Sequence, residues 1–342
     1  MNSSADTAAA RELLDLINSS WIAQACYVFA RLDLAELLAA GPRSAEDLAA
    51  AAGANAPALR RLLGALGSVA LCRQREDGRF EMTRMGALLR ADVPCSMRSW
   101  ALQWGGEAWQ VWANLLHSVK TGESARSLIT GNTGFGHLEH DPQAARTFNQ
   151  AMVDLTRLAA LDIAEGYDFS AKRIVDVGGG YGELLARILV TYPDAQGVVF
   201  DMPHAISRAR EHLAARDLGD RCEFVAGDFF QSVPSGADLY VLKTVIHDWP
   251  DNKAREILRT CLRAMSPGSR LLLIERLMPE RLGPSAENRA LARADLHMLV
   301  ALGAQERTYP QMQALLSSAG LEAIRRIETR CEFQILEASG PG

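Results

Sequence analysis

The sequence predicts an α/β protein in which a doubly wound, mainly parallel sheet follows a mostly α-helical N-terminal domain. After Lys172, short apolar runs alternate with segments of helical periodicity, which is the pattern of βαβ units. Before that point the chain is rich in alanine and leucine at helical spacing. A length of 342 residues fits two domains. We place them at 1–100 and 101–342, with a helical connector over about 101–170.

Composition argues against several classes of protein. Hydrophobic residues make up 48% of the chain and charged residues 23%, as in ordinary globular proteins. The net charge of −5 argues against a nucleic-acid partner. No apolar run reaches the roughly 18 residues that a membrane helix needs, and Met1–Ala10 lacks the core of a signal peptide. The six cysteines are scattered, without a C-x-x-C pair. We expect a cytoplasmic protein.

The N-terminal domain shows the element order of a winged helix. Trp21–Ala40 is predicted to form one or two helices, and Ser44 is a candidate cap for the next. A further helix is expected over Ala56–Ala70. Glu76-Asp77-Gly78 then separates two short strands, and Thr83 is the candidate cap of another helix. Packing against a second subunit is the interpretation favoured by the acidic net charge.

A transcription regulator is the alternative from another functional class, because winged helices often bind DNA. Several arginines keep this alternative open: Arg60, Arg61, Arg73, Arg75, Arg79 and Arg84. Between the two domains, Ser99–Met152 is predicted to be helical, with a loop at Thr130–Gly136. Four tryptophans there favour a core or interface role: Trp100, Trp104, Trp109 and Trp112.

The second domain contains seven candidate strands. The last two are close in sequence and are therefore expected to pair antiparallel. The strands are Ile174–Val177, Gly197–Phe200, Glu223–Val225, Leu239–Val245, Leu271–Glu275, Leu321–Ile327 and Phe333–Glu337. The intervening helical patterns are Leu184–Tyr192, Ala205–Ala215 and Lys253–Met265.

A glycine-rich loop follows the first of these strands. Asp176-Val177-Gly178-Gly179-Gly180-Tyr181-Gly182 leads into a helix, where the backbone can turn tightly and approach a ligand. The G-x-G-x-x-G fingerprint of dinucleotide-binding enzymes is incomplete, because Glu183 or Leu185 replaces the third glycine. This disfavours an NAD-dependent oxidoreductase. The acidic Asp176 suits a ligand with a cationic head, such as the amino group of a methionine moiety.

Polar residues also end the next three strands, where the ligand crevice of a doubly wound sheet lies. Asp201 stands 19 residues after Gly182, near the spacing expected for a carboxylate that binds ribose hydroxyls. Asp228 could accept a hydrogen bond from an adenine amino group while Phe229 covers a ring face. Lys243 ends the fourth strand at the same sheet edge.

In combination, these segments resemble the plant-type small-molecule O-methyltransferase family over nearly the whole chain. The resemblance implies a winged-helix-like dimerisation domain, a Rossmann-like seven-stranded sheet with an antiparallel last strand, S-adenosylmethionine as cofactor and a homodimer. It is carried by Asp176–Gly182, Phe200-Asp201-Met202-Pro203, Gly227-Asp228-Phe229-Phe230, Leu242–Trp249 and Gln305-Glu306-Arg307-Thr308.

The resemblance also assigns cofactor contacts. Asp201 would hold the ribose, Asp228 and Phe229 the adenine, and Lys243 the cofactor near its adenosine. Trp249 would cover the adenine. The full predicted set is Asp176, Gly178, Gly180, Asp201, Met202, Asp228, Phe229, Lys243 and Trp249.

His247 is the candidate general base. A sulfonium methyl is already activated, so no metal is expected, but a phenol with a pKa near 10 is mostly protonated at neutral pH and benefits from a base. By resemblance, Glu275 and Glu306 flank this histidine. Asp248 is given a supporting role only, because neighbours on an extended segment point in opposite directions. His137-x-x-His140 is not expected to bind a metal.

The acceptor is predicted to be a hydroxylated, aromatic small molecule in an apolar pocket. S- or N-methylation on the same scaffold stays open, since a thiolate, thioether or amine needs no general base. The candidate pocket residues are Phe148, Asn149 and Met152, which match the family pattern F-N-x-x-M, together with Asp295 and Met298.

Overall fold

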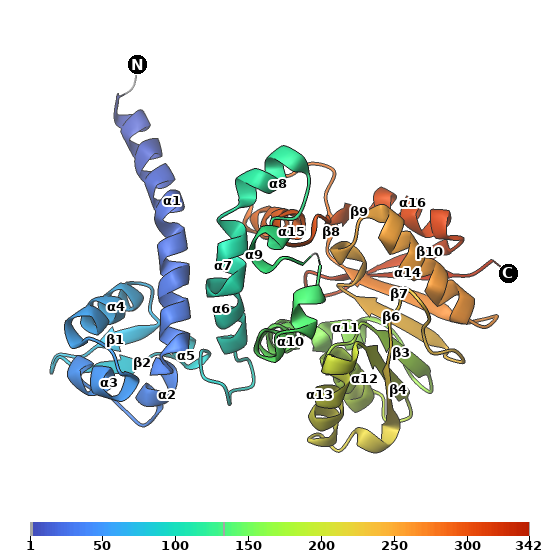
Figure 1. The fold of residues 1–342 in the computed structure, drawn as a ribbon, viewed down its shortest axis with the longest axis horizontal. Helices are drawn as coiled ribbons and strands as arrows, with labels where there is room; N and C mark the ends of the chain where they lie inside the picture. Colours follow the sequence, from blue (N-terminus) through green and yellow to red (C-terminus); the bar gives the residue numbers. More distant parts are fainter. Residues whose placement is uncertain (1–2, 133, 342) are drawn as a thin grey trace. The chain divides into compact units, whose positions relative to one another are not determined.

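The computed structural model describes residues 3–132 and 134–341 and divides into two compact units, Met1–Trp109 and Gln110–Gly342 (Figure 1). The first unit is mainly helical and carries one β-hairpin, β1–β2, whose strands are antiparallel. Its elements are α1 (Ser3–Arg31), α2 (Leu34–Ala39), α3 (Ala45–Ala52), α4 (Ala56–Ser68), β1 (Cys72–Gln74), β2 (Phe80–Met82), α5 (Arg84–Ala87) and α6 (Arg98–Gly105).

Local capping explains where these helices begin. The side chain of Ser44 accepts a hydrogen bond from the backbone N–H of Asp47, and that of Thr83 accepts one from Gly86. Both predicted caps are confirmed. The helix expected from Trp21 instead begins at Ser3. Its first half presents leucine side chains that stay exposed, so no buried apolar stripe marked its start in the sequence.

Four of the arginines that kept DNA binding open, Arg60 of α4 and three in the hairpin, lie in ion pairs with acidic side chains of the same unit. This local pairing reduces the net positive charge on which DNA binding depends. The pairs are Arg60–Glu46, Arg73–Glu81, Arg75–Glu81, Arg75–Asp77 and Arg79–Asp77.

Short helices form the predicted helical segment before the sheet. The predicted loop at Thr130–Gly136 falls between α9 and a 3₁₀ turn, and its residue 133 lies outside the described residues. The elements are α7 (Glu107–Trp112), α8 (Leu115–Thr121), α9 (Arg126–Thr130), η1 (Gly136–Glu139), α10 (Pro142–Arg157) and α11 (Ala160–Gly166).

A seven-stranded sheet with the order β10-β11-β7-β6-β3-β4-β5 forms the centre of the second unit. β3 to β7 are parallel, and β11 runs antiparallel to both neighbours, which confirms the predicted fold class. The strands are β3 (Arg173–Val177), β4 (Gln196–Asp201), β5 (Cys222–Ala226), β6 (Leu239–Lys243), β7 (Arg270–Glu275), β10 (Glu322–Glu328) and β11 (Gln334–Ser339).

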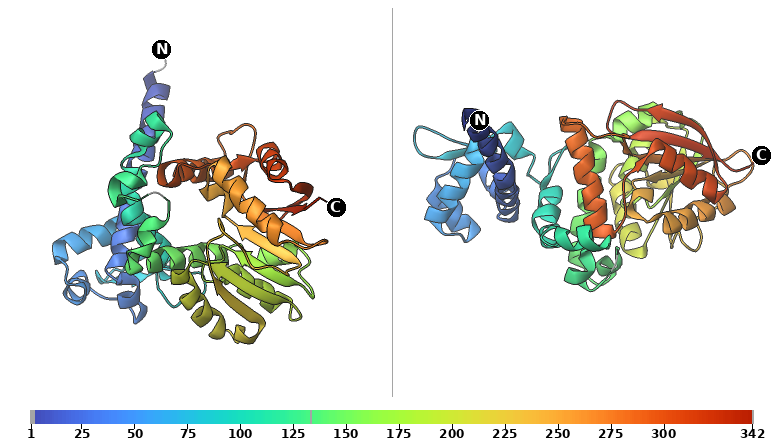
Figure 2. Two further views of the ribbon diagram at one scale, coloured as in Figure 1. Left: turned by 45° about the vertical axis from the view of Figure 1, so that its right-hand side comes forward. Right: turned by 90° about the horizontal axis from the view of Figure 1, so that it is seen from above.

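Helices cover both faces of this sheet (Figure 2). α11, α12 and α13 pack with one apolar cluster, and α14 and α16 with the other. A doubly wound sheet is therefore buried on both sides, as parallel sheets require. The remaining elements are α12 (Glu183–Thr191), α13 (Pro203–Ala214), η2 (Gly219–Arg221), η3 (Ile246–Asp248), α14 (Asp251–Ala264), β8 (Leu277–Met278), α15 (Ala286–Leu302), β9 (Arg307–Thr308) and α16 (Tyr309–Ala319).

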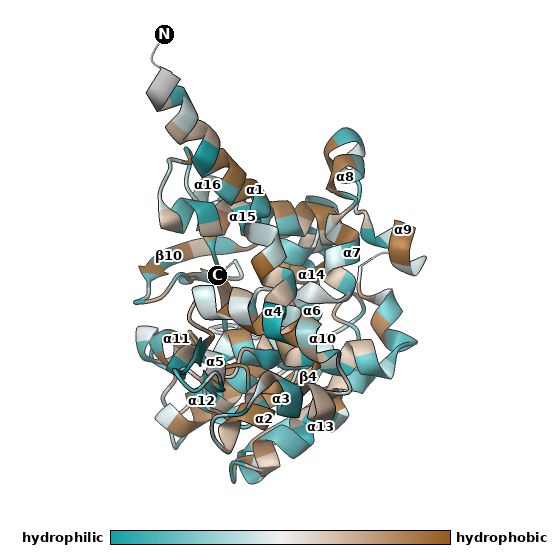
Figure 3. Ribbon diagram, turned by 90° about the vertical axis from the view of Figure 1, so that its left-hand side faces the viewer, coloured by the Kyte–Doolittle hydropathy of each residue, from teal (hydrophilic) through white to brown (hydrophobic). Residues whose placement is uncertain are grey.

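Apolar side chains remain exposed on helices of both units. Leu116 and Val119 of α8 and Leu128 of α9 are more than half exposed, and hydrophobic residues on these two helices are visible in Figure 3. On α1, Trp21 is 68% exposed. Such patches are typical of protein–protein contacts. Within residues 3–132 and 134–341, none of the helices combines the length and apolarity that crossing a membrane requires.

Candidate active site

The carboxyl ends of five parallel strands bring the predicted polar residues to one edge of the sheet. Asp176 lies near the end of β3, Asp201 ends β4 and Asp228 follows β5 by two residues. Lys243 and Glu275 end β6 and β7. Because neighbouring parallel strands end at the same edge, residues far apart in sequence form one crevice there, where doubly wound sheets bind ligands.

The glycine loop depends on backbone angles that only glycine adopts without strain. Gly178, Gly180 and Gly182 have φ values of 72°, 58° and 75°. Asp201 holds the loop: its Oδ2 accepts the backbone N–H of Gly180 at 2.7 Å, and its Oδ1 accepts that of Met202 at 2.6 Å. Each oxygen retains a second lone pair, so the predicted contact with ribose hydroxyls is compatible with these two hydrogen bonds.

Asp176 and Lys243 are buried charged groups beside the loop. Burial raises the pKa of Asp176 to about 7, and Asp201 adds to the increase while Lys243 opposes it. The Oδ2 atom of Asp176 has no hydrogen-bond partner within residues 3–132 and 134–341. Burial lowers the pKa of Lys243 to about 8, with Arg276 contributing. Asp176 therefore offers an acceptor for a cationic ligand group.

The side chain of Lys243 points toward the β11 side of the sheet. Its ammonium nitrogen lies 4.7 Å from the ring centroid of Phe333, which immediately precedes β11. Asp228 follows β5, which is the outermost strand on the side of the sheet away from β11. The predicted contact of Lys243 with the adenosine therefore gains no support from this orientation of the side chain.

Aromatic rings pack against one another next to the strand ends. Trp249 meets Phe230 at 4.8 Å and Phe229 at 6.0 Å between ring centroids, in both cases nearly perpendicular. Phe135 lies 6.2 Å from Trp249 and 5.5 Å from Phe148 of α10. The rings thus connect the end of β5 with α10, which carries three of the predicted acceptor residues.

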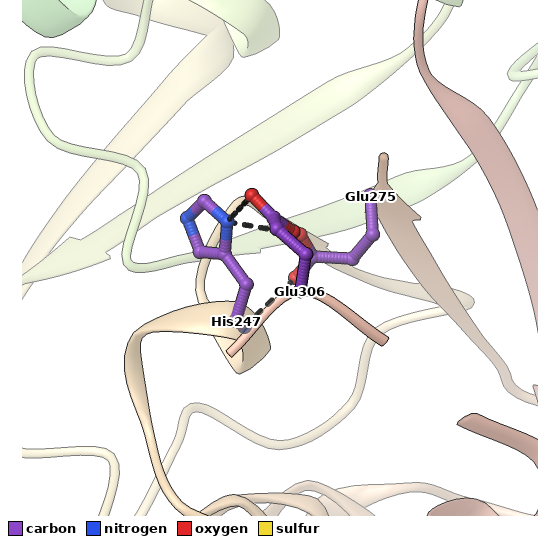
Figure 4. Close-up of side chains that lie close together, drawn as sticks. All are labelled: His247, Glu275 and Glu306. Carbon is purple, nitrogen blue, oxygen red and sulfur yellow. Dashed lines mark hydrogen bonds and ion pairs between the residues drawn. The ribbon is translucent and has the colours of Figure 1, made fainter. Parts of the chain in front are cut away.

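His247 lies among three carboxylates. Its Nδ1 atom is 2.9 Å from Oε1 of Glu306 and 3.8 Å from Oε2 of Glu275 (Figure 4). Its Nε2 atom is 3.3 Å from Oδ1 of Asp248. Glu275 also accepts the backbone N–H groups of Ile246 and His247 through Oε1, at 3.0 and 3.4 Å. The predicted catalytic residues are therefore in contact with one another.

Local structure explains this convergence and corrects one expectation. Thr244 has a φ of 51°, which ends β6 two residues before the predicted end at Val245. Residues Ile246–Asp248 then form a 3₁₀ turn, not an extended segment. The expectation that Asp248 points away from its neighbour was therefore wrong, because residues on such a turn do not alternate in direction as they do on a strand.

A two-residue ladder aligns the two glutamates. β8 pairs parallel with β9, with Leu277 opposite Arg307. Glu275 stands two residues before Leu277, and Glu306 stands one residue before Arg307. Their carboxylates consequently reach the same imidazole, although 31 positions separate them (306 − 275) in the sequence.

The carboxylates control the charge of His247. Burial alone would lower its pKa, but Glu306, Glu275 and Asp248 together raise the pKa to about 10. Burial raises the pKa of Asp248 to about 7, against the effect of His247. Burial also raises the pKa of Glu275. The three carboxylates together favour the protonated imidazole and make His247 a strong base once it is neutral.

The same three side chains have the composition of a metal site. Ligand atoms of His247, Glu275 and Glu306 lie within 4.8 Å of one another. The Nδ1 atom that would bind an ion already lies at hydrogen-bond distance from Glu306, so binding would require that contact to break.

The other histidine considered for a metal, His137, has its Nε2 atom 3.1 Å from Nη1 of Arg126. The expectation that no metal is needed stays a prediction.

The predicted acceptor residues have different surroundings. Asn149 donates from its side-chain nitrogen to Ala145, and its oxygen lies near Gly180, where an added Cβ would be 3.7 Å away. Asp295 accepts the backbone N–H of Glu306 at 2.9 Å. Asp295 therefore contacts Glu306 directly, and Asn149 lies beside the glycine loop. Phe148 belongs to the aromatic set, Met298 is buried and Met152 is half-buried.

Sequence reasoning assigned no role to Arg307, which the structure buries to 1% exposure. Its guanidinium donates to the carbonyl oxygens of Ile246 and Trp249 and to the carboxylate of Asp251. Its signal in the sequence was its place directly after Glu306, within the Gln305–Thr308 segment that carries the family resemblance. Nothing in a single sequence distinguishes a buried arginine from an exposed one.

Comparisons with known proteins agree with this geometry. Residues 112–322 match the family model of the O-methyltransferase domain, and residues 14–92 match that of the O-methyltransferase dimerisation domain. The chain is 42% identical over 327 residues to the phenazine O-methyltransferase PhzM of Lysobacter antibioticus, covering 95% of both chains. It is 32% identical over 339 residues to a phenazine-1-carboxylate N-methyltransferase of Pseudomonas aeruginosa, covering 99% of both.

A solved structure supports the comparison at the level of the fold. The structure of human N-acetylserotonin methyltransferase in complex with SAM superposes with a TM-score of 0.90 at 28% identity. The match covers 98% of both chains.

Proposed function

This chain belongs to the O-methyltransferase family, and we propose that it transfers the methyl group of S-adenosylmethionine to a hydroxyl group of a small aromatic acceptor, with His247 as general base. The domain match and the relatives support methyl transfer, and the dimerisation domain supports a homodimer. The acceptor atom and the role of His247 rest on the geometry of this chain.

The crevice suits the proposed cofactor. The buried Oδ2 of Asp176, which has no partner among the described residues, is an acceptor for an ammonium group. Asp201 and Asp228 present carboxylates for hydroxyl and amino protons, and the neighbouring rings of Phe229 and Trp249 offer apolar surface for a purine. When bound, the cofactor supplies a methyl group that its sulfonium has already activated.

The observation that carries the proposal is the contact between His247 and Glu306, at 2.9 Å in a buried site beside this crevice. The Nδ1–H group donates to Glu306, which leaves Nε2 of the neutral ring as the basic atom. Nε2 takes the proton of the acceptor hydroxyl as the new oxygen–carbon bond forms and the carbon–sulfur bond breaks. The products are a methyl ether, a neutral thioether and a histidinium.

The pKa of His247 favours an acceptor that enters the site with its hydroxyl group protonated. The pKa of His247 is raised to about 10, close to that of an ordinary phenol, so the proton transfer is nearly balanced in energy. A neutral hydroxyl group that loses its proton during the reaction fits this site best.

Calorimetric titration tests the cofactor class first. The purified protein is titrated with S-adenosylmethionine and, separately, with NAD. Micromolar binding of the former alone supports the proposal, and failure of a folded sample to bind S-adenosylmethionine contradicts it.

His247→Gln then tests the base with a panel of hydroxylated aromatic acceptors. We expect unchanged cofactor affinity and a loss in turnover of about 10²- to 10⁴-fold. Near-normal turnover would remove His247 from the role of base.

N-methylation is the second candidate, because one relative that covers 99% of both chains is named an N-methyltransferase. An amine acceptor loses its proton more readily after methylation and depends less on His247. Aromatic amines, thiols and hydroxyl compounds of matched ring structure should therefore be assayed side by side. Preferential turnover of the amine, with little effect of His247→Gln, would favour this alternative.

A further inference from the structure

We propose that Arg307 is a positioning residue that holds the backbone turn carrying His247, so that Nε2 stays aligned with the acceptor hydroxyl. The inference rests on the proposed function of His247 as general base. Arg307 follows Glu306 directly, and the two side chains contact opposite parts of one turn: Glu306 contacts the imidazole and Arg307 the main chain.

Arg307 makes four hydrogen bonds with three groups. Nη1 donates to the carbonyl oxygen of Ile246 at 3.0 Å, and Nη2 donates to that of Trp249 at 2.7 Å. Nε and Nη2 both donate to Oδ1 of Asp251, at 3.0 and 2.8 Å. The two carbonyl groups stand on either side of His247 and Asp248 in the sequence, so one rigid guanidinium spans the whole turn.

The other side of the turn is held by Glu275. Its Oε1 atom accepts the N–H groups of Ile246 and His247, while Arg307 binds carbonyl oxygens of the same segment. A carboxylate therefore binds the donors of the turn and a guanidinium binds its acceptors. With both in place, the orientation of the imidazole depends on its own contacts, that of Nδ1 with Glu306 and that of Nε2 with Asp248.

The burial of Arg307 indicates that it positions His247 and does not itself contact the acceptor. Arg307 is 1% exposed and its donors are directed at main-chain and carboxylate oxygens. It has no open surface with which to contact an acceptor. A loss of Arg307 should therefore act through the alignment of His247, which matters for turnover even at displacements near 1 Å.

This mechanism predicts selectivity among acceptors. A phenol with a pKa near 10 needs a base, whereas a nitro-substituted phenol whose pKa lies below the assay pH is already ionised. Misalignment of His247 should slow the first acceptor and not the second. A general loss of fold or of cofactor binding would slow both equally.

The test compares Arg307→Lys with the wild type on two such phenols of similar size. The lysine ammonium keeps the charge but cannot span both carbonyls and Asp251. We expect kcat for the ordinary phenol to fall by about 10- to 100-fold, part of the full contribution of a base. For the ionised phenol we expect a change of less than about twofold. Equal losses with both phenols would overturn the inference.

Two further variants keep the test decisive. Asp251→Ala removes only one partner of Arg307, and the side chain of Asp251 is 59% exposed. This variant should slow the ordinary phenol selectively as well, but by a smaller factor. Arg330→Lys, an exposed arginine paired with Asp162 and Glu165, serves as the matched control and should change neither rate. If Arg307→Lys does not fold, a lack of selectivity in Asp251→Ala overturns the inference.

The same assay separates this inference from the proposed function. His247→Gln should also slow only the ordinary phenol. If it slows neither acceptor or both alike, the role of His247 as base is wrong. If His247→Gln is selective and Arg307→Lys is not, only the positioning role of Arg307 is wrong.

Discussion

His247 and Glu306 stand 59 residues apart in the sequence, and in the folded protein Nδ1 of the first lies 2.9 Å from Oε1 of the second. Both side chains are buried. A carboxylate held against one ring nitrogen selects the tautomer and leaves the other nitrogen free to accept a proton. The predictions below follow from this pair and its surroundings.

Removing the charge of Glu306 should weaken the base. Glu306→Gln can still accept a hydrogen bond from Nδ1 but no longer stabilises the histidinium that forms. We expect kcat for a hydroxyl acceptor to fall by about 10- to 1000-fold, with unchanged affinity for S-adenosylmethionine. Steady-state kinetics and calorimetry measure the two effects. Glu332→Gln, an exposed glutamate paired with Arg276, is the matched control.

The rate should rise with pH into the alkaline range. Three carboxylates raise the pKa of His247 to about 10, so its neutral, basic form grows only as the pH approaches that value. A profile of kcat/KM for a phenol whose own pKa lies above 10 should climb from pH 7 toward about 10. Glu306→Gln should shift this rise to lower pH. A rise centred near 6.5 in the wild type would contradict the assigned environment.

Asp201 should control cofactor affinity. Asp201→Ala removes the acceptor of the Gly180 and Met202 amides together with the predicted ribose contacts. We expect cofactor binding to weaken by about 1–3 kcal/mol. Calorimetric titration of a folded variant measures this, and unchanged affinity would remove Asp201 from the cofactor site. Asp162→Ala, at an ion-paired residue of α11, provides the comparison.

Asp295 should act through Glu306. Its carboxylate accepts the backbone N–H of Glu306, and burial raises its pKa. Asp295→Asn keeps an acceptor oxygen, so we expect kcat within about threefold of wild type, whereas Asp295→Ala should lower it by about tenfold through one lost buried hydrogen bond. Steady-state measurement of kcat and KM for both variants with the same acceptor tests this expectation. If KM for the acceptor alone changes, Asp295 contacts the acceptor directly, as the sequence analysis expected.

Chelation should leave activity intact. His247, Glu275 and Glu306 resemble a ligand set, but an activated sulfonium methyl needs no Lewis acid. We expect the same rate of methyl transfer before and after dialysis against EDTA. Added Zn²⁺ should inhibit, because it competes with Glu306 for Nδ1 of His247. Loss of activity with EDTA that a divalent ion restores would show that the cluster is a metal centre.

The cofactor crevice was largely predictable because it depends on residues near one another in sequence. The loop Asp176–Gly182 combines an acid, four glycines and a strand-to-helix transition within seven positions. Positive φ at Gly178, Gly180 and Gly182 follows from this local pattern. The placement of Asp201 also follows, because the ends of adjacent parallel strands must meet.

Side-chain direction was less predictable. Asp248 was expected to point away from His247, but the 3₁₀ turn after Thr244 brings its carboxylate to within 3.3 Å of Nε2. Lys243 lies where a strand end was predicted, yet its ammonium faces Phe333 near β11. A strand end specifies where a Cα lies, whereas the rotamer depends on what packs around it.

The sequence by itself determined the alternation of strands and helices, the glycine loop and the residue types at the edge of the sheet, since periodicity, glycine content and strand ends are local properties. Only the tertiary structure decided that Glu306 holds Nδ1, that Asp295 holds Glu306 and that Arg307 spans the turn of His247. These contacts join segments through β8 and β9, a ladder of two residues. So short a pairing has no periodic signal in the sequence.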